Sequence, residues 1–296
     1  MPTNFISSPK NPRLKEIVRL RDAAYRREKG LFIIEGVREV RLALESGFSV
    51  REIFICPGYF NPSLRANGVS EAIPTEIASS SRHFVGTPRN DHAGIPLEVA
   101  KARKTKIIEL DKKAYEKIAF GERKEGIIAV AVSPRFCLSE IKIKPKAMIM
   151  VVEGLEKPGN LGAIARSADA SGVCALIAAD TKGDIYNPNA IRSSLGAIFS
   201  VKTLKESSAK VIAWLKANNI EIISAVVGAG LDYTRVDFNQ SLAIVLGSEE
   251  NGLSRIWRDN SDYQVRLPMS GRVDSLNVSV TAGILLYEAL RQRSGK

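Results

Sequence analysis

Four short, continuous apolar runs in the second half of the chain constrain its fold more than any other feature. They read AMIMVV, CALIAA, IEIISAVV and LAIVLG, a composition typical of strands that are buried on both faces of a parallel sheet. Helical patterns lie between them, including SSAKVIAWLKANN and the segment after Pro158. Strands that alternate with helices predict an α/β fold in which helices cover both faces of a parallel sheet.

The first half predicts a smaller, mixed α/β domain. The segment NPRLKEIVRLRDAAYRREKG predicts one helix over residues 11–30 that stops at Gly30. Further on, LFIIEG, VREIFIC, TKIIELD and GIIAVAV predict strands, whereas VREVRLALESG and KKAYEKIAF predict helices. The weakly periodic residues 61–103 are expected to form loops or an insertion.

The segment SPRFCLSEIKIKPKA predicts a domain boundary, because it contains two prolines and loses the clear periodicity on either side. We therefore expect a first domain over residues 1–135, a linker over residues 136–146 and a second domain over residues 147–296.

Positive charge is concentrated in the first half. The chain carries a net charge of +11, and residues 1–150 hold 27 Lys and Arg against 17 Asp and Glu, whereas the rest holds 16 against 15. This asymmetry indicates that the first domain holds a polyanion such as a nucleic acid. The alternative is that the cations only solvate exposed helix faces. The candidate phosphate-binding side chains on the first predicted helix are Arg13, Lys15, Arg19, Arg26 and Arg27.

Composition also bears on the compartment. No apolar run approaches the roughly 20 residues of a membrane span, and Met1 to Lys10 lack the apolar core of a secretory signal. Cys56, Cys137 and Cys174 are odd in number, widely spaced and without a CxxC pattern, which argues against a disulfide framework and a zinc site. We expect buried thiols in a reducing cytoplasm.

The loops after the strands are the places to search for chemistry, because ligands of open α/β sheets bind outside the carboxyl ends of the strands. The first unusual loop, EGLEKPGN, leads into a helix of small residues that contains Arg166. Asn160 either caps this helix or serves a ligand. Arg166 either pairs with Asp169 on an exposed face or offers its guanidinium to a phosphate. No GxGxxG pattern is present, so a dinucleotide-binding fold lacks its main signal.

Two further loops are unusual. In GSEENGLS, glycines at 247 and 252 permit tight backbone turns, and Glu249 and Glu250 bring carboxylates to the edge of the sheet. In VRLPMSGRVDSLNVSVTAGILLYEALRQR, Pro268 ends a strand, and Ser275 or Asn277 begins an amphipathic helix. Taken singly, each loop could be an ordinary connection between a strand and a helix.

Together and in this order, KPGNLGAIARSADASGV, IVLGSEENGLS and LPMSGRVDSLNVSVTAGILLYEALRQ resemble the three motifs of the SpoU (TrmH) family of RNA ribose 2′-O-methyltransferases, in the SPOUT superfamily. The resemblance spans about residues 147–293. The first half is similar, more loosely, to the substrate-binding domain of many members, which has an RNA-binding fold known from ribosomal proteins. Its recognisable pieces are SPKNPRLKEIVRLRDAAYRREKGLFIIEGVREVRLALESG and GERKEGIIAVAV.

The resemblance implies S-adenosylmethionine as the cofactor, no metal, a homodimer with sites near the subunit interface, and a deep trefoil knot in the second domain. It assigns the catalytic positions to Asn160, Arg166, Glu249, Ser275 and Asn277. It assigns donor binding to Gly247, Leu267, Met269, Leu276 and Asn277, and gives Arg166 an RNA contact as well. The sequence departs from the family pattern at Lys157, at Glu250-Asn251 and at Thr281.

The implied reaction is transfer of a methyl group to a ribose 2′-hydroxyl of structured RNA. The separate first domain favours ribosomal RNA of the 23S type over transfer RNA. A non-catalytic RNA-binding assembly factor is the alternative from another class, whereas the basic first half disfavours a small-molecule methyltransferase. Because arginine stays protonated, we expect Arg166 to hold a phosphate, while the proton passes to a phosphate oxygen, to Glu249 or to water.

Overall fold

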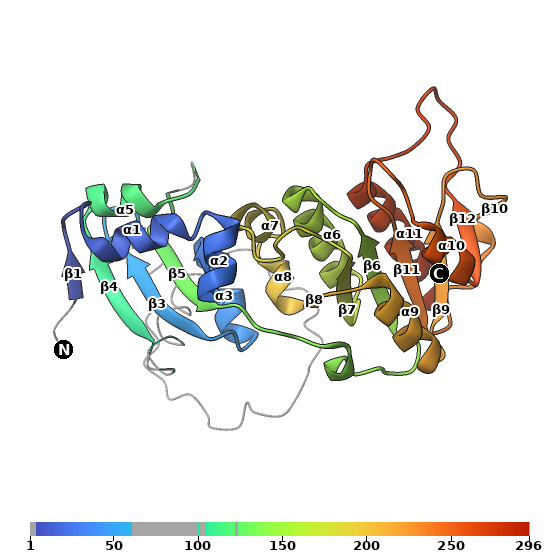
Figure 1. Ribbon diagram of the computed structural model, residues 1–296, viewed down its shortest axis with the longest axis horizontal. Coiled ribbons are helices and arrows are strands. Elements are labelled where there is room, and N and C mark those ends of the chain that lie inside the picture. Colours follow the sequence, from blue (N-terminus) through green and yellow to red (C-terminus); the bar gives the residue numbers. More distant parts are fainter. Residues whose placement is uncertain (1–3, 61–99, 101–102, 104, 122–123, 296) are drawn as a thin grey trace. The chain divides into compact units, whose positions relative to one another are not determined.

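The computed structural model describes residues 4–60, 100, 103, 105–121 and 124–295 (Figure 1). The loops predicted over residues 61–103 therefore lie outside the described residues, apart from Ala100 and Arg103. The chain divides into two compact units. The first consists of Met1–Val18 and Ile34–Ala131, and the second of Arg19–Ile33 and Val132–Lys296.

The N-terminal part is built on a mixed five-stranded sheet with the order β1-β4-β3-β5-β2. Its elements are β1 (Asn4–Ile6), α1 (Pro12–Arg19), α2 (Ala23–Lys29), β2 (Leu31–Glu35), α3 (Val37–Glu45), β3 (Val50–Ile55), β4 (Lys106–Leu110), α5 (Lys112–Ile118) and β5 (Ile127–Val132). β4 runs parallel to β1 and β3, whereas β5 is antiparallel to β3. The predicted mixed α/β pattern is confirmed, as are all the strands and helices predicted between residues 31 and 132.

The single helix predicted over residues 11–30 is wrong, because the structure has two helices there. The carboxylate of Asp22 accepts a hydrogen bond from the Tyr25 backbone N–H at 2.8 Å and caps α2. This cap begins a separate helix at Ala23, whereas α1 ends at Arg19. The predicted stop is confirmed, since Gly30 closes α2 in the left-handed conformation with φ of 61°.

The second unit contains a seven-stranded sheet with the order β10-β12-β9-β11-β6-β7-β8, and all its neighbouring strands are parallel. Its strands are β6 (Met148–Glu153), β7 (Ala175–Ala179), β8 (Lys202–Glu206), β9 (Glu221–Ala225), β10 (Leu231–Asp232), β11 (Leu242–Leu246) and β12 (Tyr263–Arg266). Its helices are α6 (Pro158–Ala170), α7 (Pro188–Ser193), α8 (Ala197–Ser200), α9 (Ser208–Ala217), α10 (Arg255–Asn260) and α11 (Val278–Arg293), with 3₁₀ turns η2 (Leu138–Glu140) and η3 (Tyr233–Arg235). The parallel sheet predicted from the apolar runs is confirmed.

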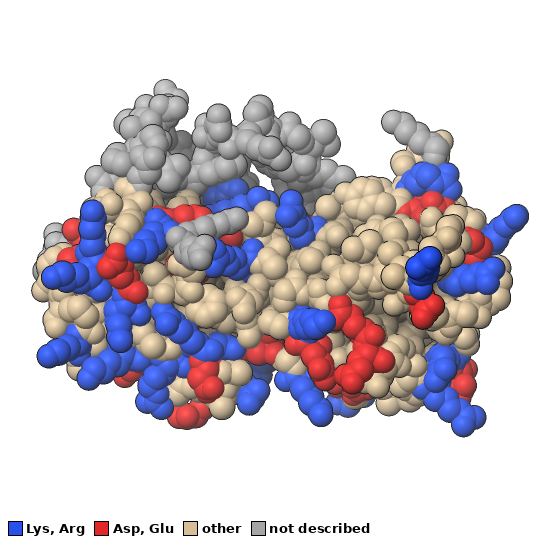
Figure 2. All heavy atoms as spheres, turned by 90° about the horizontal axis from the view of Figure 1, so that it is seen from above, with Lys and Arg blue, Asp and Glu red and all other residues tan. Residues whose placement is uncertain are grey.

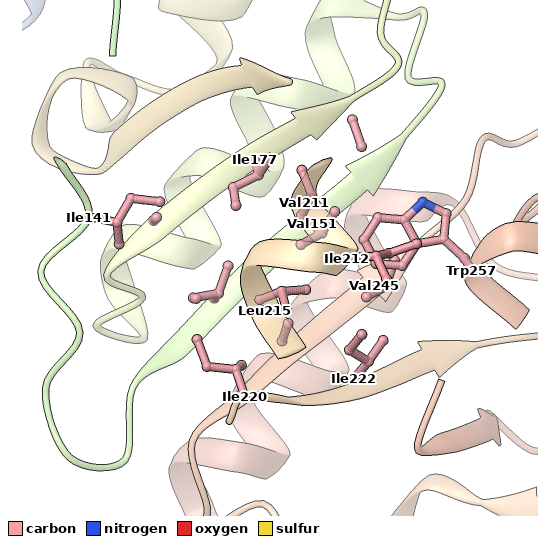
Figure 3. Close-up of a cluster of buried hydrophobic side chains, with 14 of the residues drawn as sticks. Ile141, Val151, Ile177, Val211, Ile212, Leu215, Ile220, Ile222, Val245 and Trp257 are labelled. Atoms are coloured by element: carbon pink, nitrogen blue, oxygen red, sulfur yellow. The ribbon is translucent and has the colours of Figure 1, made fainter. Parts of the chain in front are cut away.

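Helices cover both faces of this sheet. On one face, alternate residues of the central strands pack against Val211, Leu215 and Trp257 of α9 and α10 (Figure 3). The other face is covered by α6 and α11, which contact each other. Both faces of β6 and β11 are buried, and this explains why their sequences are continuously apolar instead of alternating.

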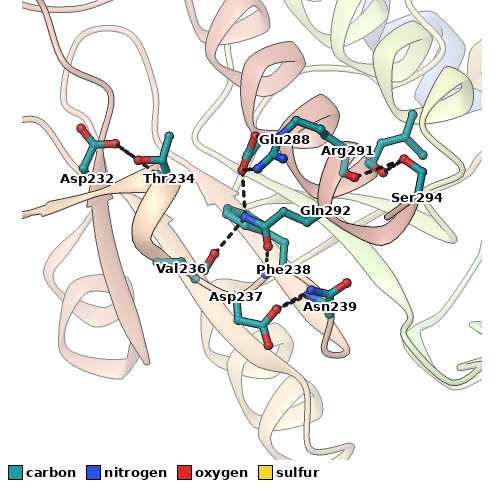
Figure 4. Close-up of polar contacts among 11 residues, drawn as sticks. Asp232, Thr234, Val236, Asp237, Phe238, Asn239, Glu288, Arg291, Gln292 and Ser294 are labelled. Atoms are coloured by element: carbon teal, nitrogen blue, oxygen red, sulfur yellow. Dashed lines mark hydrogen bonds and ion pairs between the residues drawn. The ribbon is translucent and has the colours of Figure 1, made fainter. Parts of the chain in front are cut away.

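The end of the last helix is fastened to the loop that precedes β11 (Figure 4). Gln292 accepts a hydrogen bond from the Phe238 backbone N–H at 2.9 Å and donates to the Val236 carbonyl at 3.1 Å. The guanidinium of Arg293 donates to the carbonyl oxygens of Phe238, Lys146 and Gln240 at 2.7–2.8 Å. These bonds fix the C-terminal end of α11.

The compact units divide the chain differently from the predicted domain limits at two places. Ile141, from the segment predicted as a linker, is 7% exposed and belongs to the core of the second unit, against which Phe136 and Ile143 also pack. Arg19–Ile33 likewise belongs to the second unit, in which Phe32 stacks on Tyr186 with ring centroids 4.6 Å apart. Apolar side chains at irregular spacing carry these contacts, so periodicity alone does not reveal them.

Candidate functional site

The register of the sheet brings two of the unusual loops together. β11 pairs in parallel with β6, and Leu246 lies opposite Val152 near the carboxyl end of each strand. The loops that follow therefore leave the same edge of the sheet. The third loop, residues 267–277, follows β12 and leads into α11, which packs against α6 and β11.

Side chains from all three loops meet at the carboxylate of Glu249, which belongs to the second loop. Glu249 Oε1 accepts hydrogen bonds from Asn160 Nδ2 at 2.8 Å and from Asn277 Nδ2 at 2.7 Å. Glu249 Oε2 forms an ion pair with Lys157 Nζ at 2.6 Å. The structure thus assembles three of the predicted catalytic residues, and we call Lys157, Asn160, Glu249 and Asn277 the carboxylate cluster.

The electrostatics of the carboxylate cluster favour an ionised Glu249. The hydrogen bond from Lys157 lowers the pKa of the Glu249 carboxyl below its ordinary value, and the hydrogen bond from Asn160 acts in the same direction. The same contact with Glu249 raises the pKa of Lys157. A carboxylate held in this way is a fixed acceptor and a weak base.

The asparagines differ in their structural roles. Asn160 is not a helix cap, because α6 begins at Pro158 with Lys157 in the N-cap position. Asn277 does cap α11, since its Oδ1 accepts from Ser279 N at 2.9 Å while its Nδ2 reaches Glu249. One amide therefore joins the first turn of the last helix to the carboxylate cluster.

A cavity of about 910 Å³ adjoins the carboxylate cluster. Lys157, Glu249 and Asn277 contribute to its wall, as does Ser275. Backbone-rich segments after β9, β11 and β12 supply most of the remaining wall. The predicted donor-binding positions that line it are Gly247, Leu267, Met269, Leu276 and Asn277.

Gly247 is required by close packing in the wall of the cavity. A Cβ at this position would lie 2.0 Å from the carbonyl carbon of Gly252 and 2.3 Å from Leu253 N. These are backbone atoms, which cannot turn aside as a flexible side chain can. A bridge between Ser248 and Gly252 closes the same loop on itself.

Arg166 lies apart from these residues. It is exposed on α6, does not line the cavity and makes no ion pair among the residues that the structure describes. The structure therefore gathers Asn160, Glu249 and Asn277 in one chain, places Ser275 in the cavity wall and leaves Arg166 outside.

The small residues near Arg166 serve the packing of helices. A Cβ on Gly162 would lie 1.9 Å from Ser193 Oγ and 2.3 Å from the Ala190 carbonyl oxygen, both in α7. Glycine thus permits close approach of α6 and α7. The small side chain is needed at this helix interface, and Gly162 does not line the cavity.

The basic residues predicted to bind RNA have different environments. Lys15 and Arg27 are exposed, whereas Arg13 is bonded to Glu16 and Glu52. Arg19 lies over the ring of Tyr25, with its guanidinium carbon 4.0 Å from the ring centroid. Figure 2 shows Lys and Arg outnumbering Asp and Glu over the N-terminal part of the visible face.

The prediction for Arg26 is contradicted, because its side chain is only 2% exposed. Its guanidinium donates to the carbonyl oxygens of Leu20 and Arg21 at 2.7 and 2.8 Å and forms an ion pair with Asp184. The break between α1 and α2 turns this residue inward. A single continuous helix would have placed it on the polar face.

An aromatic and basic cluster escaped the sequence analysis. The ammonium groups of Lys112 and Lys124 lie 5.6 and 5.3 Å from the ring centroid of Tyr59, and Tyr115 lies beside that ring at 5.4 Å. These residues are 53 or more positions apart from Tyr59 in sequence, so only the fold unites them. Glu116 lies in the same cluster, because its carboxylate accepts hydrogen bonds from Lys124 Nζ at 3.0 Å and from the Tyr59 hydroxyl.

Three further observations bear on the predictions. Cys56 is buried, but Cys137 is exposed and Cys174 is half-buried, so the expectation of three buried thiols is wrong for Cys137. Within the described part of the chain, no group of three or more His, Cys, Asp or Glu could hold a metal ion. No helix among the described residues is both long and apolar enough for a membrane span.

Comparisons with known proteins show the family of the chain. The model of the SpoU rRNA Methylase family matches residues 147–287, and that of the MRM3-like substrate binding domain matches residues 11–129. The chain belongs to the SpoU family of RNA methyltransferases.

Particular relatives cover most of the chain. It is 30% identical over 274 residues to the 23S rRNA (uridine(2479)-2′-O)-methyltransferase of Streptomyces viridochromogenes, covering 90% of this chain and 85% of that protein. It is 34% identical to the 23S rRNA (guanosine-2′-O-)-methyltransferase RlmB of Bordetella pertussis, over 67% of this chain and 83% of the relative.

Two solved structures of methyltransferases are similar to this chain over nearly its whole length. An RNA 2′-O ribose methyltransferase is 36% identical with a TM-score of 0.76, over 98% of this chain and 99% of that one. The S. viridochromogenes methyltransferase AviRb in complex with the cofactor AdoMet is 28% identical with a TM-score of 0.77, over 96% of this chain and 99% of that one.

Proposed function

We propose that this protein transfers a methyl group from S-adenosylmethionine to a ribose 2′-hydroxyl of structured RNA, with ribosomal RNA of the 23S type as its substrate. The observation that carries the proposal is the carboxylate cluster beside the 910 Å³ cavity, where Asn160, Glu249 and Asn277 from three loops meet. The relatives named for 23S rRNA favour ribosomal RNA over transfer RNA.

The cavity fits S-adenosylmethionine in its chemistry. An adenosine moiety needs apolar walls and backbone polar groups, and Leu246, Leu267 and Leu276 line the cavity beside the main chain of residues 247–253. Leu276 remains 38% exposed, so it offers an apolar surface to a ligand. A pure RNA-binding assembly factor would have no use for such a cavity next to ionised Glu249.

The donor supplies a methyl group on a positively charged sulfur. Glu249 serves as the shared acceptor that orients the amides of Asn160 and Asn277, and Lys157 keeps it ionised. Because both Glu249 oxygens are engaged, we assign the 2′-hydroxyl proton to a phosphate oxygen of the substrate or to water. Arg166, which stays protonated, binds the target phosphate and orients the hydroxyl.

We infer a homodimer in which Arg166 completes the site of the second copy. This accounts for a motif arginine that lies outside the carboxylate cluster of its own chain. Apolar side chains exposed on α11 support an interface between copies, with Val280 49%, Tyr287 53% and Leu290 37% exposed.

A mixing experiment tests this arrangement. Arg166→Ala is expected to abolish methyl transfer, and Glu249→Ala to lower it about 100-fold. If the two residues act across the interface, a 1:1 mixture of the variants is expected to recover about a quarter of the wild-type sites, because half of the dimers are mixed and each mixed dimer has one intact site. No recovery in mixed dimers, with mixing verified by affinity tags, would contradict sites shared between copies.

Further features of the family are part of the proposal. We infer that the chain is knotted as a deep trefoil, since α11 returns from β12 at one side of the sheet to pack on α6 and β11 near its centre. We infer that the mixed N-terminal sheet is an RNA-binding fold like that of some ribosomal proteins, and that the protein acts in the cytoplasm.

The decisive experiment is labelled methyl transfer from S-adenosylmethionine to ribosomal and transfer RNA, followed by mapping of the modified ribose. We expect a single 2′-O-methylated nucleotide in large-subunit ribosomal RNA. Modification of transfer RNA alone would show that transfer RNA is the substrate instead of ribosomal RNA. Donor binding without methylation of either RNA would favour the non-catalytic assembly factor.

A further inference from the structure

Glu153 is a buried carboxylate to which no role has yet been given. It is the last residue of β6 and follows five apolar residues, and it is only 8% exposed. It does not line the cavity. A buried charge needs several hydrogen-bond donors to offset the loss of hydration, so its partners indicate what it does.

The partners of Glu153 lie at the end of the loop that walls the cavity. Its Oε2 accepts from Ser254 N at 2.7 Å, and its Oε1 accepts from Ser254 Oγ at 2.6 Å. Oε1 also accepts from Ser208 Oγ at 3.2 Å, and that hydroxyl accepts from Trp257 Nε1 at 2.9 Å. Trp257 is fully buried in the core.

These bonds make Glu153 the fixed end of a loop. Residues 247–253 all line the cavity, and the loop starts directly from β11. Its interior is closed by hydrogen bonds from Gly252 N and Asn251 N to Ser248, at 3.0 and 3.1 Å. At its far end, Ser254 is bonded to Glu153 through both its backbone N–H and its hydroxyl.

We propose that Glu153 is a positioning residue that holds residues 247–254 in the conformation that binds the methyl donor. It acts through Ser254 and does not touch the donor. The inference rests on the proposed function, because it takes the cavity beside Glu249 to be the donor site.

The chain offers graded variants and a matched control. Glu153→Ala removes all three acceptor contacts, whereas Glu153→Gln keeps one oxygen for Ser254 N–H. Ser254→Ala removes only the hydroxyl contact. Asp262→Ala is the control, since Asp262 also accepts a backbone N–H, from Ile222 at 2.7 Å near the amino end of β9, and lies outside the cavity wall.

The test combines calorimetry with S-adenosylhomocysteine, amide hydrogen exchange without any ligand, and thermal unfolding. For Glu153→Ala we expect Kd to rise about tenfold and exchange to quicken within residues 247–254. Glu153→Gln should recover most of the affinity. Asp262→Ala should lower Tm while leaving Kd unchanged.

Unchanged Kd in Glu153→Ala, or exchange that quickens equally throughout the sheet, would overturn the positioning role. Should Glu153→Ala fail to fold, Ser254→Ala decides, with an expected rise in Kd of about threefold and refutation if Kd stays constant. Failure of the wild-type protein to bind S-adenosylhomocysteine would overturn the proposed function instead, whereas hydrogen exchange still tests the anchoring of the loop.

Discussion

Removal of the Glu249 side chain tests whether this carboxylate orients its neighbours or accepts a proton. Glu249→Ala removes the common acceptor of Asn160 and Asn277, whose amide nitrogens lie 2.8 and 2.7 Å from Oε1. A hydrogen bond to a charged acceptor contributes about 1.5 kcal/mol at the low end of its range, which suits a side chain that is 27% exposed. Loss of both corresponds to about 3 kcal/mol, or about a 100-fold fall in kcat.

Glu249→Gln separates the two roles. The glutamine oxygen can still accept from both asparagines, although its amide nitrogen faces the ammonium of Lys157, another donor. If Glu249 only orients, we expect this variant to retain activity within about tenfold of the wild type. If Glu249 were the base, glutamine could not take the proton, and Glu249→Gln would lose as much methyl-transfer activity as Glu249→Ala.

The assay is single-turnover methyl transfer to RNA, measured with donor binding by calorimetry so that loss of affinity is not mistaken for loss of rate. Glu156→Gln is the control, because Glu156 is exposed in the first loop and does not line the cavity. Equal losses above about 1000-fold in both Glu249 variants, with donor binding retained, would refute the orienting role and identify Glu249 as the base.

Three other predictions concern neighbouring features. Lys157→Met removes the cation that lowers the pKa of Glu249, so this pKa should rise. Because the ionised carboxylate is the stronger acceptor for the two asparagines, the fall in activity on its protonation should move to higher pH in the pH–rate profile, and an unmoved acidic limb would contradict the coupling. Gly247→Ala places a Cβ 2.0 Å from the carbonyl carbon of Gly252, and calorimetry should show donor binding weakened about tenfold or more. Unchanged donor binding would show that the loop has room for the Cβ. Arg293→Ala removes three hydrogen bonds to carbonyl oxygens, which together contribute about 3 kcal/mol to the free energy of unfolding. Calorimetric unfolding should therefore show Tm lower by about 6–12 °C, and a fall of less than about 2 °C would show that these bonds do not stabilise the end of α11.

The fold was predictable where burial leaves a strong pattern in the sequence. β7 and β11 are buried on both faces and continuously apolar, and β6 departs from this pattern only at its last residue, Glu153. The strand β8 reads KTLKE, and the sheet order puts it at an edge, where only some of its residues are buried. The helices α7, α8 and α10 have six residues or fewer, too few for helical periodicity to be seen.

The candidate site was predictable only in part, because its members are far apart in the sequence. Asn160 and Glu249 are separated by 89 positions and meet through the parallel register of β6 and β11. No local pattern reports that register. Lys157 was noticed only as a departure from the family motif, although its ammonium is the ion-pair partner of Glu249. Glu153 carried one usable signal, a carboxylate that ends an otherwise apolar strand.

Asn277 shows why structural and functional interpretations of such loops need not exclude each other. Its Oδ1 caps α11 by accepting from Ser279 N, and its Nδ2 donates to Glu249. Since an amide has an acceptor and a donor end, one side chain begins the helix and fixes the carboxylate at the same time. Arg293 fastens the other end of that helix to the loop before β11. The last helix is thereby held at both ends, and the geometry of the carboxylate cluster depends on the stability of this helix as well as on its own hydrogen bonds.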